Sequence, residues 1–149
     1  MSSEKIEAAI IFEILGKPAE HIVEALEEII KQIESEKGVV IKEKRIDEPK
    51  EFEKDKGMYT TFAELLVEFD ELMNVIIILF KYMPAHIQIM YPEKITLKNN
   101  EMNDVFNEVA RRLHAYDEVA RVIQIEKSVL ETKLRELLGN KEEKVEDDD

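Results

Sequence analysis

The last third of the chain carries a long repeat of apolar residues. A spacing that averages 3.5 residues keeps one stripe of an α-helix facing a partner, as in coiled coils. Residues 100–138 contain neither glycine nor proline, so the repeat predicts one uninterrupted, coiled-coil-like helix over that range. Its members follow one another at alternating spacings of four and three, with Lys127 as the polar exception: Met102, Phe106, Val109, Leu113, Tyr116, Ala120, Ile123, Lys127, Leu130, Leu134 and Leu137.

A helix of this length is too long to lie wholly on its own domain. At 1.5 Å per residue, residues 101–138 span ~57 Å, whereas a domain of about 110 residues is ~30 Å across. The apolar stripe is wide up to about residue 124 and narrower afterwards. A wide stripe suits packing on a sheet, and a narrow one suits a partner helix. We therefore predict that residues 101 to about 118 dock on the chain's own domain and that residues 119–138 drive assembly.

The expected partner of this helix is a second copy of the chain, and a helix of another protein is the alternative. A single polar residue in such a seam, here Lys127, selects register or oligomer number at some loss in stability. The residues expected at the interface are Tyr116, Ala120, Ile123, Lys127, Leu130, Leu134 and Leu137.

Residues 1–99 show the patterns of a small α+β domain. Every second residue is apolar in the strand-like stretches, and apolar residues recur at spacings of three and four residues in the helical stretches. The expected elements are a strand over 5–16, a helix over 18–37, strands over 39–46 and 58–69, a helix over 71–83 and a strand over 86–91. Right-handed crossovers then place both helices on one face of a four-stranded antiparallel sheet, the ferredoxin-like βαββαβ arrangement.

Charge and composition restrict the classes of partner. The formal net charge is −13, which opposes binding to a phosphate backbone, so nucleic acid is an unlikely partner. The segment 139–149 is strongly acidic and is expected to be a disordered tail. The chain is rich in Lys, Glu and Ile and has no cysteine, a composition that resembles thermophile proteins and suits the cytoplasm. No apolar run reaches the ~20 residues of a membrane span.

One cluster on the open sheet face is a candidate site. Glu13 and Glu68 lie near the ends of their expected strands, and His86 lies at the start of its own. If the first strand runs parallel to the third, all three side chains meet at one end of the face. Two carboxylates and an imidazole can hold a divalent metal ion or transfer protons. The first alternative function is therefore that of a metal- or small-ligand-binding protein. An enzyme that uses the same three residues is one form of this alternative.

An RNA-binding sheet is the second alternative. Such sheets stack bases on exposed aromatic residues beside basic ones, and the open face would offer Phe62, with Arg111 and Arg112 on the long helix. No cysteine nucleophile and no glycine-rich phosphate loop is present, and no catalytic activity is evident. We therefore expect an assembly or regulatory module that self-associates through its C-terminal helix, without a cofactor, rather than an enzyme.

Overall fold

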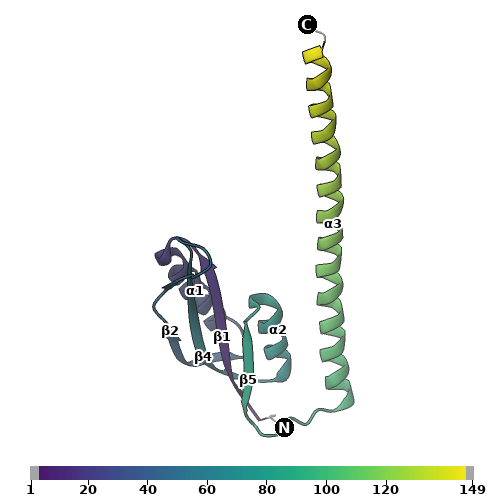
Figure 1. Ribbon diagram of the computed structural model, residues 1–149. Coiled ribbons are helices and arrows are strands. Elements are labelled where there is room, and N and C mark those ends of the chain that lie inside the picture. The colour runs from purple at the N-terminus through teal and green to yellow at the C-terminus, as the bar shows by residue number, and fades with distance from the viewer. Residues whose placement is uncertain (1–3, 147–149) are drawn as a thin grey trace. The chain divides into compact units, whose positions relative to one another are not determined.

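A computed structural model describes the backbone of residues 4–146 and the side chains of residues 4–141. The chain forms an antiparallel sheet with helices and ends in a long helix (Figure 1). The elements, in chain order, are β1 (Ile6–Gly16), α1 (Ala19–Glu34), β2 (Val39–Ile46), β3 (Lys50–Glu51), β4 (Tyr59–Phe69), α2 (Leu72–Tyr82), β5 (His86–Tyr91) and α3 (Asn99–Glu146).

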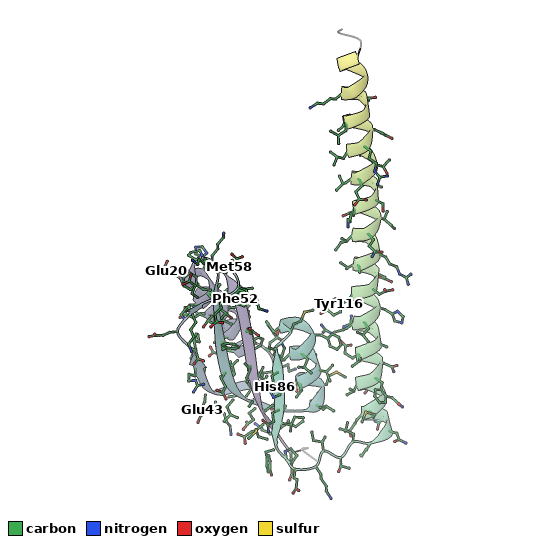
Figure 2. All side chains as sticks on the ribbon, viewed as in Figure 1. Glu20, Glu43, Phe52, Met58, His86 and Tyr116 are labelled. Atoms are coloured by element: carbon green, nitrogen blue, oxygen red, sulfur yellow. The ribbon has the colours of Figure 1, made fainter. Side chains whose placement is uncertain are left out.

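The sheet has the order expected of a ferredoxin-like fold. Its strands run β2-β4-β1-β5, and the two-residue strand β3 also pairs with β4. Every pairing is antiparallel. The predicted α+β class and ferredoxin-like order of elements are confirmed, and β3 is an addition within the charged stretch that follows β2. Glu43 on β2 and His86 on β5 mark the two outer strands in Figure 2.

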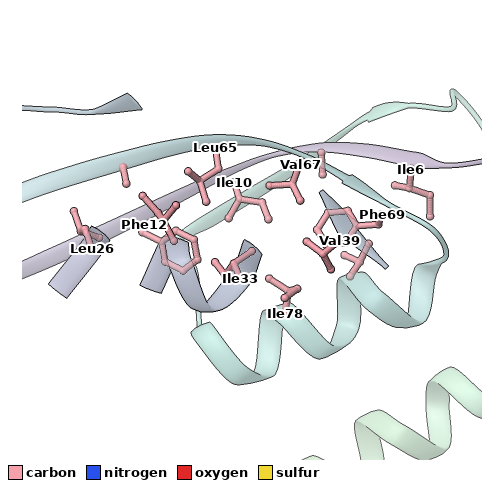
Figure 3. Close-up of a cluster of buried hydrophobic side chains, with 14 residues drawn as sticks. Ile6, Ile10, Phe12, Leu26, Ile33, Val39, Leu65, Val67, Phe69 and Ile78 are labelled. Carbon is pink, nitrogen blue, oxygen red and sulfur yellow. The ribbon is translucent and has the colours of Figure 1, made fainter. Parts of the chain in front are cut away.

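Both α1 and α2 cover the same face of the sheet. Alternate side chains of β1 and β4 point to this face, and Ile10, Leu65 and Phe69 are completely buried there. Helix α1 contributes Leu26 and Ile33 to the same cluster, and α2 contributes further aliphatic residues (Figure 3). Burying one such side chain stabilises the fold by roughly 1.5–3 kcal/mol. The other face of the sheet has no helix of the compact unit on it and carries the candidate site residues.

The turn that enters β2 is held against the start of α2. Gly38 has a φ of 76°, and its carbonyl accepts a hydrogen bond of 2.9 Å from the Asp70 N–H. The Asn74 side chain donates to the Lys37 carbonyl (3.2 Å) and accepts from the Glu71 N–H (3.0 Å). Asn74 therefore caps α2 and holds the β2 turn at the same time.

Helix α3 differs from its predicted limits at both ends. It runs to Glu146, so residues 139–146 are helical and not a separate tail, because one glycine at position 139 costs only ~1 kcal/mol in a helix. Residues 147–149 of the predicted tail lie outside the described residues. The compact unit that contains the sheet ends at Val105, and Phe106–Asp149 is a second unit. The first seven residues of α3, Asn99–Val105, belong to the compact unit, and the docking of residues 101 to about 118 stays a prediction.

Candidate functional site

The three residues of the predicted open-face site do not come together. Strand β1 runs antiparallel to both of its neighbours, so the expected parallel pairing was wrong. Glu68 is therefore opposite Glu7, and Glu13 is opposite Phe62. Six positions of β1 separate Glu7 from Glu13, about 20 Å at 3.3 Å per residue. Glu13 and Glu68 cannot share a metal ion over that distance.

His86 lies nearer to Glu13 than to Glu68. It pairs with Ile11 across β1, so it stands diagonally from Glu13 on the open face. One imidazole beside one carboxylate gives two ligands, whereas zinc sites in proteins use three or four. Within residues 4–141, no group of three His, Asp or Glu side chains is placed to hold a metal ion.

Glu68 instead belongs to a set of ion pairs that we call the lysine bridge: Lys5, Glu7, Lys42 and Glu68. The Lys42 Nζ lies 2.6 Å from a Glu7 oxygen and 3.0 Å from a Glu68 oxygen, and Lys5 lies 3.4 Å from Glu68. Hydrogen bonds from Lys42 lower the pKa of Glu68, and those to Glu7 and Glu68 raise the pKa of Lys42. The lysine bridge thus joins β1, β2 and β4 by opposite charges, which is the arrangement of a structural cross-strand tie.

Sequence reasoning missed Glu7 and Lys42 as the partners of Glu68. Lys42 reaches both carboxylates because β2 has a bulge at this residue, between the pairs Ile41–Val67 and Glu43–Leu66. A bulge redirects a side chain and shifts the register by one residue. Nothing in the sequence VVIKEKRI shows where that extra residue lies.

A second polar cluster joins α2 to the turn before β2. The Lys81 Nζ and the Tyr82 hydroxyl each lie 2.7 Å from one oxygen of Glu36. Burial, and then the hydrogen bond to Glu36, raise the pKa of Tyr82 to about 12. A tyrosine that keeps its proton so firmly is a poor general base at neutral pH, so this cluster serves to hold α2 in place.

Two surface clefts in the described part of the compact unit combine apolar and charged side chains. The first, of about 360 Å³, lies where the segment after β5 passes the starts of β1, α2 and α3, and it combines apolar side chains such as Ile6, Leu72 and Val105 with carboxylates such as Glu4 and Glu101. The second, of about 740 Å³, lies around Gly38 and Asn74. Neither is lined by a histidine, serine or cysteine.

The seam of α3 exposes its aliphatic residues. Ile123 is 57% exposed, Leu134 is 58% exposed, and Leu130 and Leu137 are each 65% exposed. Tyr116 is 41% exposed. The seam from Tyr116 to Leu137 is therefore a row of mostly apolar, exposed side chains along one helix.

Positive and negative charges balance along α3 and form ion pairs within the helix. Residues 106–138 hold six Lys and Arg against six Asp and Glu, so this stretch is neutral in a chain of net charge −13. Several of these charges pair one turn apart, as Arg121 does with Asp117 (3.0 Å) and Lys127 with Glu131 (3.9 Å). No helix in the described part of the chain is both long and apolar enough to cross a membrane.

Glu108 is the most perturbed acid of α3. Arg111 Nε donates to it at 3.1 Å and Arg112 Nε at 2.7 Å. These hydrogen bonds, Arg111 first, lower the pKa of Glu108 to about 2. The two arginines named for the RNA-binding alternative therefore already neutralise a carboxylate of their own helix.

Comparison with known proteins gives one family assignment. A search of curated proteins found no match. The sequence matches the MJ0538 family over residues 7–145, which includes the whole sheet except its first residue and nearly all of α3. The chain belongs to the MJ0538 family.

Proposed function

We propose that this protein is an assembly module whose copies associate through the seam of α3. The observation that carries the proposal is the exposed row Ile123, Leu130, Leu134 and Leu137, which repeats at coiled-coil spacing on a helix far longer than a compact domain requires. Such a module holds several small ferredoxin-like domains together.

The apolar seam supplies energy of the same order as the cost of association. Burying each of the four aliphatic residues on two helices contributes roughly 1.5 kcal/mol at the low end, or on the order of 10 kcal/mol together. Bringing two chains together costs an estimated ~4–15 kcal/mol. The rest of the seam, including Leu113 and Ala120, adds to the favourable side.

A second copy of the chain fits this surface because the seam stretch is neutral. The charge of −13 on each chain repels other copies, but residues 106–138 contribute none of it. Each copy also brings the same row of aliphatic residues at the same spacing, so two copies match in length and pattern. A foreign helix would have to supply an equal row.

The test compares two isoleucines of α3 that differ in position and little in exposure. Ile123 lies on the seam and is 57% exposed, and Ile125 is 65% exposed and lies two residues further on. Two residues turn the helix by ~200°, so Ile125 points away from the seam. Ile123→Glu should remove the seam contact and so lower the mass of the multimer in light scattering, and Ile125→Glu should leave the mass unchanged.

Each other outcome would count against the proposal. If the parent chain is monomeric, or if both substitutions leave the multimer intact, the seam does not hold copies together. If both substitutions dissociate it equally, the contact is not confined to the seam. Circular dichroism at 222 nm on the same samples shows whether the two variants retain equal helix content.

A further inference from the structure

The two outer strands of the sheet differ in how they are protected from other strands. An outer strand presents unpaired backbone N–H and C=O groups, and proteins usually guard it with charged side chains or a bulge. Strand β2 has both. It carries Lys42, Glu43, Lys44 and Arg45 in succession, and the bulge lies at Lys42. Glu43 marks this guarded edge in Figure 2.

Strand β5 at the other edge has no charged side chain, and its one irregularity in pairing with β1 lies near its end, at Met90. Its sequence is HIQIMY, without a lysine, arginine, aspartate or glutamate. Ile87 packs against the core, but Ile89, two residues further on the same strand face, is 41% exposed. Met90 is 56% exposed and Tyr91 is 50% exposed. An uncharged outer strand with exposed apolar residues is a template for pairing with another strand.

We propose that β5 pairs antiparallel with β5 of a second copy, so that two sheets join into one. Residues opposite each other in such a pair share a face, which requires the two residue numbers of each pair to differ by an even number. Centring the pair on Gln88 meets this condition. It puts Ile87 opposite Ile89 of the second copy on the core face, and it brings His86 opposite Met90, the irregular residue, at each end of the pair.

The pairing is self-complementary, which is why a second copy is the occupant. Each Ile89 gains the cover of Ile87, which its own chain does not give it, and no two like charges meet. The same pairing at β2 would place Lys, Glu and Arg side chains against one another. Centring on Ile89 instead would move the irregular residue Met90 from the end of the pair to a position beside its centre, opposite Gln88. This contact is separate from the α3 seam and does not depend on it.

Disulfide crosslinking tests the pairing, because the chain has no cysteine of its own. Two residues facing each other across an antiparallel pair have Cα atoms ~4.5–5.5 Å apart, within the ~4.4–6.8 Å that a disulfide spans. The Gln88→Cys variant should therefore form a covalent dimer under mild oxidation. The His86→Cys variant is the matched control, because its two cysteines would be about 13 Å apart, four positions at 3.3 Å. We expect the first to crosslink at least about tenfold faster than the second, given that difference in reach.

Light scattering of the same full chains separates this proposal from the α3 proposal. Rapid crosslinking of Gln88→Cys supports the β5 pair whatever the mass of the parent chain. Equal slow crosslinking of both variants would overturn it, even if the parent chain is a multimer. A third variant, Glu43→Cys on β2, should crosslink as slowly as His86→Cys, and rapid crosslinking there would show that any exposed edge reacts.

Discussion

At the scale of single residues, Gly38 shows how a turn and a helix depend on one position. Its backbone φ is 76°, a value that residues with a Cβ atom rarely adopt. A Cβ built on Gly38 would also lie 2.8 Å from the Asn74 Nδ2, the group that ties the turn to α2. Gly57 has a φ of 92° as well, but a Cβ there would meet nothing within 4 Å.

We predict that Gly38→Ala destabilises the fold more than Gly57→Ala does. Both substitutions carry the cost of the left-handed backbone, ~1–2 kcal/mol. Gly38→Ala additionally displaces Asn74 and weakens the cap of α2, which adds ~1 kcal/mol. Urea unfolding of the two variants measures the difference, and equal losses would show that Asn74 moves aside without consequence.

Glu108 gives a residue-scale prediction for pH. Its pKa in the folded chain is about 2, below the ordinary value of 4.5. A lowered pKa stabilises the fold fully above the unfolded-state value, and that contribution is lost as the pH falls from about 4.5 to about 2. Glu108→Gln should therefore lower the melting temperature at pH 6 and have a vanishing effect near pH 2. Melting curves that differ by the same amount at both pH values would contradict the arginine pairing.

The error in the predicted open-face site also concerns single residues. Alternation in the sequence shows which residues of a strand share one face of the sheet. Glu13, Glu68 and His86 do lie on the open face, as predicted from this alternation. The direction and register of neighbouring strands decide which of them meet, and both arise from contacts distant in sequence. Hence Glu68 lies beside Glu7 and Lys42, which no local pattern could indicate.

At the scale of elements, periodicity predicted most of the fold because each element buries one face. Alternation in β1 and β4 and the three-four spacing in α1 are direct consequences of one buried face. Strand β3 was missed because two residues cannot show a period. The end of α3 was predicted too early because a glycine stops a helix only when the backbone turns there, and at Gly139 it stays helical.

Lys127 carries the element-scale prediction for α3. It occupies a seam position between Ile123 and Leu130, and its Nζ lies 3.9 Å from Glu131 of the same helix. Lys127→Leu would place an apolar side chain in the seam, worth ~1.5–3 kcal/mol for each buried leucine. We expect the multimer to dissociate at a lower protein concentration than the parent chain does, measured by light scattering on dilution. An unchanged dissociation concentration would place residue 127 outside the contact.

At the scale of the whole molecule, charge and apolar surface are separated along the chain. Residues 106–138 are neutral and carry the exposed seam, and the remainder of the chain holds the net charge of −13. Membership of the MJ0538 family extends over both compact units, from residue 7 to residue 145. The sheet domain and the long helix are therefore features of one family and not a chance fusion.

This separation predicts how association responds to salt. Repulsion between acidic copies weakens as the Debye length falls from ~30 Å at 0.01 M to ~3 Å at 1 M, while the apolar seam is unaffected by screening. Self-association should therefore tighten, on the order of tenfold over that range. Sedimentation at several salt concentrations measures it. Weaker association at high salt would mean that ion pairs between copies dominate the contact.

The measurement that tests the central claim most directly is the mass of the unmodified chain in solution. One chain has a mass of 17.4 kDa. Light scattering across a dilution series should give an integral multiple of that mass at high concentration, falling toward 17.4 kDa on dilution. A mass of 17.4 kDa that persists to millimolar concentration would contradict assembly through α3.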